Sequence, residues 1–158
     1  MATKEQSMAD YLVVTSPQNW KTTADLGWTV LGLKSTRRNV ASSLRKGDRV
    51  ACYETGVKRF IAVLAIDGDC FEDHSPIWGG KKEGEDYPYR YPIKPIAVVD
   101  QDQSLDAVAL SQELEFPKKW GTHLSLAFQG NVKPIPGPDI ERIADALREA
   151  KAVTVGTA

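Results

Sequence analysis

The sequence predicts an α+β fold, a small curled sheet or barrel of about six short strands with three or more peripheral helices. Two observations carry this prediction. Short apolar and β-branched runs end in turn signals, and the helical patterns between them are too few for a repeating strand–helix–strand order. A doubly wound parallel sheet is therefore disfavoured. With 158 residues and 42% hydrophobic content, the chain suits one domain with one core.

The expected strands follow from these runs and their turn residues. The strongest signal is a hairpin whose two strands are joined through Thr55-Gly56. Its second strand (RFIAVLAI) is apolar on both faces, as in a strand covered on both sides. Pro92 and Pro95 lack N–H donors and push the strand that contains them toward an edge or a bulge. The strands are expected at residues 11–15, 48–54, 59–67, 89–99, 124–128 and 132–135.

Helices are expected at residues 39–44, at residues 104–114 with Ser104 as the cap, and from Pro138 onward. The last helix has the clearest pattern, because a proline lies in its first turn and acids follow near its N-terminus. Its apolar face comprises Ile140, Ile143, Ala144 and Leu147. Residues 18–27 are expected to be irregular or briefly helical.

The chain is expected to divide into a disordered tail (1–10), one domain (11–150) and a C-terminal tail (151–158). Only two cysteines occur, and no uncharged apolar run approaches the ~18 residues of a membrane span. We therefore expect a cytoplasmic protein with no membrane partner. The oligomeric state is open, with a monomer favoured, and no heptad seam is present.

Net charge restricts the possible partners. Twenty Lys and Arg against 21 Asp and Glu give a formal charge of −1, so any site for a polyanion must be local. The segment GLKSTRRN (32–39) is the candidate, since Lys34, Arg37 and Arg38 lie within five positions. The alternative is an ordinary solvated surface before a short helix.

The sequence gives little support for a catalytic site or a metal site. His74 lies among acids and is expected at the surface, whereas His123, beside Trp120 and Gly121, could make either a structural hydrogen bond or a ligand contact. The cysteines and histidines match no compact zinc spacing, and no glycine-rich phosphate loop occurs. The acids of residues 67–73 fit a solvated turn better than a calcium loop. We predict no catalytic residue, no metal and no cofactor.

Aromatic residues concentrate in predicted turns, at Trp20, Trp78, Tyr87, Tyr89 and Trp120. Core packing is the ordinary role for each of them. Together they could form a slot for a nucleobase, because stacking on an aromatic face contributes about 1–3 kcal/mol per base. The amides of Gln129 and Asn131 could read the edge of such a base or, equally, form the turn around Gly130. The long charged, glycine-rich loop at residues 68–88, which contains Trp78, is a further functional candidate.

Several quoted segments together resemble the EVE domain, a family of the PUA-like superfamily that also includes the YTH readers of methylated adenine in RNA. They are YLVVTSPQNW, GLKSTRRNVASSLRKGDRVACYETGVKRFIAV, SPIW, YPYRYPIKP and KKWGTHLSLAFQGNVKPIP, which run from Tyr11 to about Ile143. The resemblance implies a PUA-like β-barrel wrapped by helices. It also implies an aromatic-walled pocket for a modified base flipped out of DNA or RNA, or for a modified nucleoside, without catalysis.

Carried onto this sequence, the resemblance implies stacking by Trp20 and Trp78, edge contacts by Ser35 and Asn131, and phosphate contacts by Lys34 and Arg38. The glycine- and lysine-rich loop and the PKKWGTHLSLAFQGN segment depart from the DNA-reading members, which leaves the ligand open. Two rivals are an enzyme acting on a nucleotide or small anion through His123 or Asp73, and an adaptor that docks a protein through residues 68–88. The full set of candidate ligand-binding residues is Ser16, Trp20, Lys34, Ser35, Arg38, Trp78, Tyr89, Arg90, Trp120, Gln129 and Asn131.

Overall fold

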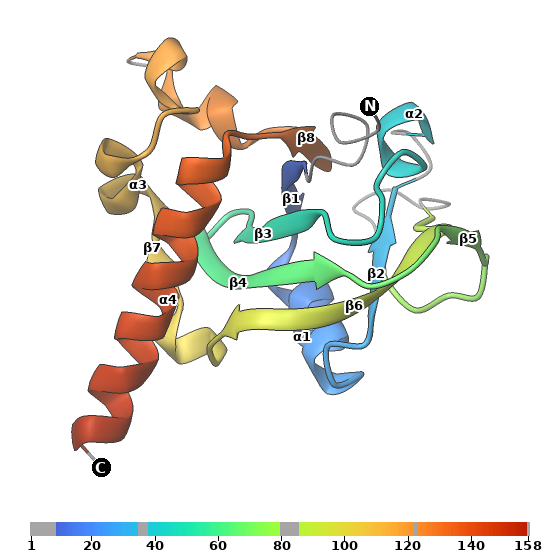
Figure 1. Cartoon of the computed structure of the whole chain (residues 1–158), viewed down its shortest axis with the longest axis horizontal. Helices are drawn as coiled ribbons and strands as arrows, with labels where there is room; N and C mark the ends of the chain where they lie inside the picture. The colour runs from blue at the N-terminus through green and yellow to red at the C-terminus, as the bar shows by residue number, and fades with distance from the viewer. Residues whose placement is uncertain (1–8, 35–37, 80–85, 122, 158) are drawn as a thin grey trace, which may run out of the picture.

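A curled, mixed β-sheet flanked by helices forms the protein, as the sequence predicted (Figure 1). The computed structural model describes residues 9–34, 38–79, 86–121 and 123–157, apart from the side chains of residues 38, 39, 125 and 152–157. Within that part of the chain the sheet runs in the order β2-β6-β4-β3-β1-β8, with β5 attached to β6 and β7 to β4. The strands are β1 (Asp10–Thr15), β2 (Val30–Leu33), β3 (Arg49–Glu54), β4 (Arg59–Ile66), β5 (Phe71–Glu72), β6 (Tyr89–Val98), β7 (Leu105–Asp106) and β8 (Val132–Pro134).

Strand β6 curls the sheet because its two halves pair with different neighbours. Its first half pairs with β2, in register from Leu33↔Tyr89 to Val30↔Pro92, and its second half pairs with β4. The β4–β6 register shifts between Val63 and Leu64, and Leu64 is the partner of Pro95. The proline therefore lies at a bulge, where the missing N–H is tolerated and the strand bends.

In Figure 1, α4 runs beside the ends of β3, β4 and β6, which it contacts, and α1 lies behind β4 and β6. The side chains of Ile140, Ile143 and Leu147 on α4 are completely buried, so the predicted apolar face is the one that packs on the sheet. The α-helices are α1 (Pro17–Asp25), α2 (Arg38–Ala41), α3 (Ala107–Leu110) and α4 (Gly137–Thr157), and the 3₁₀ helices are η2 (Gln101–Gln103), η3 (Ser111–Glu113), η4 (Lys118–Trp120) and η5 (Leu124–Phe128).

Two predicted elements are wrong in type or extent. The run LSLAF, expected as a strand at 124–128, is the 3₁₀ helix η5, because a short apolar run fits either conformation. The helix expected at 104–114 is interrupted. Residues 105–106 pair with β4 as β7, Asp106 then caps the short α3, and η3 follows. Pairing with a distant strand overrides the local helix preference there.

Two other helices are longer than expected. Residues 18–27 are predicted to be irregular or briefly helical. The structure has the nine-residue helix α1 there, whose N-terminus is capped by the Ser16 hydroxyl and whose first residue is Pro17. Helix α4 continues to Thr157, so most of the expected C-terminal tail is helical. Residues 1–8 of the expected N-terminal tail lie outside the described residues. None of the helices in the described part of the chain has the length and hydropathy of a membrane span.

Candidate functional site

A cavity of about 760 Å³ opens at the seam where the two ends of the curled sheet, β2 and β8, approach each other. Segments far apart in the sequence contribute to it: the end of β1, the start of α1, the residue after β2, and the turn between η5 and β8. Among the described residues its lining comprises Val14, Thr15, Ser16, Gln18, Asn19, Lys34, Thr55, Gly79, Tyr87, Phe128, Gln129, Gly130 and Asn131.

Asn131 joins the two ends of the sheet. Its Oδ1 accepts a hydrogen bond from the Lys34 backbone N–H at 2.7 Å, and its Nδ2 donates to the Val14 carbonyl at 3.0 Å. The Val14 N–H donates in turn to the Asn131 carbonyl at 2.8 Å. Asn131 is buried, so the two side-chain bonds replace bonds to water that the amide has lost. This side chain therefore fixes the spacing between β1 and the residue that follows β2.

Asn19 organises the opposite wall of the cavity. Its Nδ2 lies within hydrogen-bonding distance of Thr15 Oγ1 (2.9 Å), the Gly79 carbonyl (2.8 Å) and the Tyr87 hydroxyl (3.3 Å). Its Oδ1 accepts from the Gly79 N–H at 3.1 Å. One buried amide thus holds β1, the residue after Trp78 and the approach to β6 in place.

The described lining combines polar and apolar surface and is almost uncharged. Lys34 is its one charged residue, and no Asp or Glu belongs to it. Two aromatic residues border the cavity, Tyr87 and Phe128, which are 3% and 6% exposed. Phe128 is held by parallel stacking on Tyr53, with ring centroids 4.5 Å apart and planes inclined by 7°. The chemistry of this lining suits a neutral planar group or an anion, and it offers no counter-charge to a cation.

Trp78 and Arg90 form a second layer behind the cavity wall. The Arg90 guanidinium lies 5.1 Å from the centroid of the Trp78 ring, and that ring lies 6.4 Å from the ring of Tyr87. Arg90 is 1% exposed and donates to the Tyr87 carbonyl and the Ser75 hydroxyl. The other face of the indole covers Gly32, where a Cβ atom would lie 2.5 Å from the Trp78 ring. Trp78 and Arg90, both predicted to bind the ligand, therefore position Tyr87.

Trp20 lies in the hydrophobic core. The side chain is 1% exposed, and its indole N–H donates to the Tyr53 carbonyl at 2.8 Å. Its ring stacks on Trp28, with centroids 6.3 Å apart. In this conformation the indole presents no face to a ligand, because an apolar ring with a satisfied N–H is most stable inside the core. The structure thus gives Trp20 a packing role in place of the predicted stacking role.

Of the predicted site residues, the structure brings Ser16, Lys34, Gln129 and Asn131 to the cavity. Tyr89, at the start of β6, and Trp120, on η4, are not among the described lining residues. Ser35 and the Arg38 side chain lie outside the described residues. Sequence reasoning missed Thr15, Asn19, Tyr87 and Phe128 as lining residues. For Asn19 a signal existed, since the cap Ser16 and Pro17 place it in the first turn of a helix after β1.

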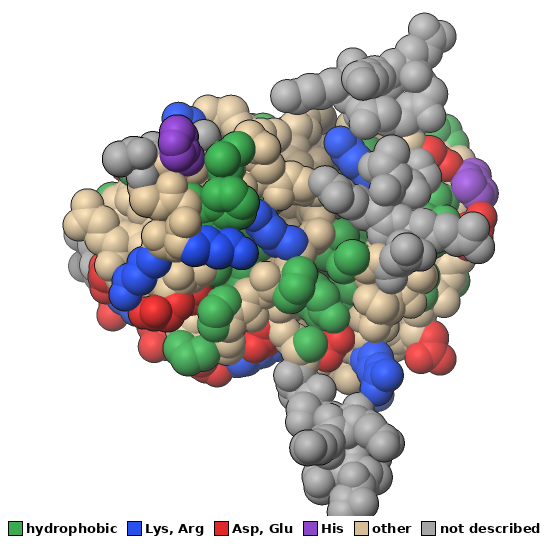
Figure 2. All heavy atoms as spheres, turned by 90° about the horizontal axis from the view of Figure 1, so that it is seen from above, with side chains coloured by type: hydrophobic (Ala, Val, Ile, Leu, Met, Phe, Trp, Pro, Cys, Tyr) green, Lys and Arg blue, Asp and Glu red, His purple; other side chains and the backbone are tan. Residues whose placement is uncertain are grey.

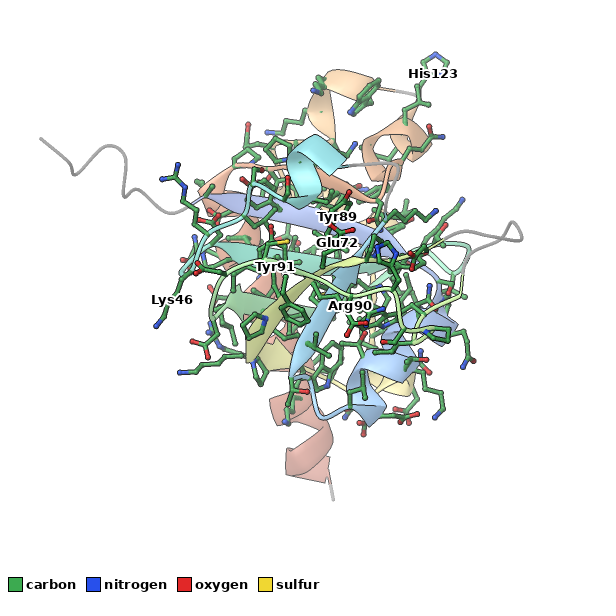
Figure 3. All side chains as sticks on the ribbon, turned by 90° about the vertical axis from the view of Figure 1, so that its right-hand side faces the viewer. Lys46, Glu72, Tyr89, Arg90, Tyr91 and His123 are labelled. Atoms are coloured by element: carbon green, nitrogen blue, oxygen red, sulfur yellow. The ribbon has the colours of Figure 1, made fainter. Side chains whose placement is uncertain are left out.

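The residues of the rival catalytic hypothesis lie apart from the cavity. His123 is exposed and projects from the η4–η5 segment, away from the sheet that carries Arg90 and Tyr91 (Figure 3). Asp73 accepts from the Ser75 N–H, which lowers the pKa of its carboxyl, and pairs with Arg90 at 3.4 Å. An ionised, engaged carboxylate is a weak base. In the described part of the chain no three His, Cys, Asp or Glu side chains are grouped so as to hold a metal ion.

No protein-family model matches the chain. Two proteins of similar sequence are the UPF0310 protein PH1033 of Pyrococcus horikoshii and the UPF0310 protein PYRAB08750 of Pyrococcus abyssi. Each is 24% identical, over 153 and 151 residues respectively, which is 89% of this chain in both cases and 99% and 100% of the relative.

Solved structures of the same fold include two YTH domains. The complex of the YTH domain-containing protein mmi1 with RNA has a TM-score of 0.64 at 10% identity and covers 94% of this chain and 87% of that one. The YTH domain of Zygosaccharomyces rouxii MRB1, in complex with N6-methyladenosine RNA, has a TM-score of 0.61 at 16% identity, with 89% and 87% covered. Rpa0253 from Rhodopseudomonas palustris has a TM-score of 0.58 at 17% identity, with 90% and 94% covered. In fold, this chain is similar to YTH domains.

Proposed function

We propose that the protein is a non-enzymatic module that binds single-stranded DNA or RNA and recognises a modified base, which it holds in the seam cavity. The single observation that carries this proposal is the composition of that cavity: amides, hydroxyls, two aromatic rings and one lysine, with no carboxylate among the described lining residues. A flipped base needs apolar surface for its faces and hydrogen-bonding groups for its edge. The volume of about 760 Å³ lies within the range of small-molecule sites.

The proposed roles differ from those first expected for the tryptophans. Tyr87 and Phe128 supply the aromatic surface, with Trp78 and Arg90 supporting Tyr87 from behind. Gln129, exposed at the turn before Gly130, supplies an adaptable amide for the edge of the base, whereas the bonds of Asn131 already join the sheet ends. Ser16 borders the cavity, and its hydroxyl accepts from the Asn19 N–H at 3.1 Å. Ser35 remains a proposed edge contact, and Tyr89 remains a proposed ligand-binding residue.

Lys34 and Arg38 would hold the backbone phosphates outside the cavity. Lys34 follows β2 directly and borders the cavity, so its ammonium group can reach a phosphate beside a bound base. A net charge of −1 gives no general attraction for polyanions, so affinity has to come from such local contacts.

The comparisons support the same reading. The fold is shared with YTH domains that are bound to RNA, in one case to RNA containing N6-methyladenosine. We further propose that the chain is an EVE-type member of the PUA-like superfamily, with a single domain over residues 11–150, and that it acts in the cytoplasm as a monomer. The rival adaptor function is less well supported, because Trp78 in the proposed docking loop is not exposed to a partner. It is buried against Gly32 and Thr23 of the same domain.

The test is a titration with short oligonucleotides that carry 5-methylcytosine, 5-hydroxymethylcytosine, N6-methyladenine or plain bases, each at two salt concentrations. We expect one modified base to be preferred over its plain counterpart. Gln129→Ala should reduce that preference, since it removes an edge contact. Lys34→Gln should weaken the binding of all oligonucleotides by the same factor. It should also reduce the slope of log K against log salt by about 0.7.

Lys94→Gln is the matched control. Lys94 is an exposed lysine on β6 that pairs with Asp67 and does not border the cavity, so its loss should change neither affinity nor preference. Equal affinity of the wild-type protein for every modified and plain base would reject the proposal. Turnover of a nucleotide that is lost in a folded His123→Ala variant would favour the enzyme instead.

A further inference from the structure

Beside the cavity, the η4–η5–β8 segment carries an indole flanked by two ammonium groups. The Nζ atoms of Lys119 and Lys133 lie 5.3 and 5.8 Å from the centroid of the Trp120 ring. Trp120 is half-buried and packs against the core, so the ring is anchored while part of it reaches the surface. On the face shown in Figure 2, Lys and Arg side chains (blue) lie directly beside hydrophobic side chains (green). We call Trp120, Lys119 and Lys133 the indole–lysine surface.

In the described part of the chain, the acids nearest to Lys119 in the sequence are engaged with other groups, and Lys133 also donates to the Leu126 carbonyl at 3.4 Å. Lys119 makes no ion pair with any described residue. Glu115 pairs with Lys118 at 2.9 Å, and Glu113 pairs with Arg142 on α4. Asp139 is buried and accepts hydrogen bonds from two backbone N–H groups, those of Glu115 and Phe116, at 2.7 and 2.8 Å. Among the described residues, no ion pair therefore offsets the charge of Lys119, which suits contact with a polyanion.

The surface is continuous with the cavity. Phe128 and Asn131 line the cavity, and Lys133 follows Asn131 by two residues, a distance of at most about 7 Å along the chain. On the other side, Phe128 ends η5 and packs edge-on against Phe116, whose ring centroid is 5.6 Å away and which leads into η4. A strand that leaves the cavity between η5 and β8 would meet the indole–lysine surface first.

We propose that Trp120 stacks the base next to the one in the cavity, while Lys119 and Lys133 bind the phosphates that flank it. This inference rests on the proposed function, since it takes its ligand from that site. The present lysine–indole contacts do not prevent it. An exposed cation–π contact changes affinity only about 2- to 5-fold, whereas stacking of one base on an aromatic ring changes it about 5- to 160-fold. The two ammonium groups can exchange the ring for phosphate.

The experiment compares a short single-stranded oligonucleotide, containing the preferred modified base, with the same modified nucleoside free in solution. The nucleoside reaches only the cavity. Trp120→Ala should weaken oligonucleotide binding about 10-fold or more and leave nucleoside binding unchanged, whereas Trp120→Phe should retain most of the affinity. The double variant Lys119→Gln/Lys133→Gln should reduce the slope of log K against log salt by about 1.4, with Lys94→Gln as the control.

Circular dichroism and thermal melting of each variant separate lost binding from lost folding, and the lysine variants test the surface without removing the ring. If a folded Trp120→Ala variant binds the oligonucleotide with wild-type affinity, this inference is wrong. If that variant still prefers the modified base, the proposed function stands. The opposite result, oligonucleotide binding that depends on Trp120 but ignores base modification, would support the surface and reject the reader function.

Discussion

Two buried asparagine side chains hold the cavity together at the scale of single residues. Asn131 fixes the distance between β1 and the residue after β2, and Asn19 ties Thr15, Gly79 and Tyr87 into one wall. Each amide makes hydrogen bonds in directions that only its own geometry satisfies. The hydrogen bonds of both asparagines are thus used within the protein, whereas Gln129 is exposed, which is why the proposed edge contact is assigned to Gln129.

Residue types alone predicted the polar part of this site better than the aromatic part. Ser16, Lys34, Gln129 and Asn131, which were predicted as ligand-binding residues, lie at the cavity. A tryptophan in a turn, however, gives no indication of the side to which its ring points. Trp20 points into the core, where the Tyr53 carbonyl accepts from its N–H, whereas Trp120 lies on a peripheral 3₁₀ helix. That choice depends on packing partners that are distant in the sequence.

Trp20→Phe tests the core role of Trp20. The change leaves the Tyr53 carbonyl without its donor and opens a small void, so the free energy of unfolding should fall by about 1–3 kcal/mol. Affinity for the preferred oligonucleotide should stay at the wild-type value. Urea unfolding and the oligonucleotide titration measure the two effects. If the variant has wild-type stability but has lost the preference for the modified base, Trp20 stacks on the base and its core role is wrong.

At the scale of elements, β5 and the residues after it support the cavity from outside. His74 hydrogen-bonds Glu72 of β5 through Nε2 at 2.8 Å and Asp86 through Nδ1, and Asp86 directly precedes the lining residue Tyr87. Nearby, Asp73 and Ser75 meet the buried Arg90. The sequence placed His74 at an acidic surface, which is correct, but its second partner lies 12 positions along the chain and gave no local signal.

Stability should depend on pH through His74. Hydrogen bonds to Glu72 and then to Asp86 raise the pKa of its imidazole above the ordinary value of about 6.5. Because the folded pKa is raised, the stabilisation is fully present below the unfolded pKa and disappears as the pH rises through the folded pKa. The difference in melting temperature between wild type and His74→Gln should therefore be larger at about pH 5.5 than at about pH 9. A difference in melting temperature that is constant or grows with pH would show that the protonated imidazole does not stabilise this segment.

At the scale of the whole molecule, the sheet curls so that its end strands β2 and β8 approach each other, and no ladder joins them among the described residues. The class of fold could be predicted from strand and helix patterns, including the hairpin of β3 and β4 and the apolar face of α4. The seam could not, because the bond that closes it joins Lys34 to Asn131, which are 97 positions apart. Its position depends on how far the whole sheet curls, which is set by the two pairings of β6.

The most direct measurement of the central claim is a map of backbone amide NMR shifts as the preferred modified nucleoside is added to the isotope-labelled protein. If the seam cavity holds the base, the largest shifts should fall on residues from its separate segments, namely Ser16, Asn19, Lys34, Gln129, Gly130 and Asn131, and the plain nucleoside should shift them less. Shifts that cluster on another face of the molecule, or are identical for the plain and modified nucleosides, would contradict it.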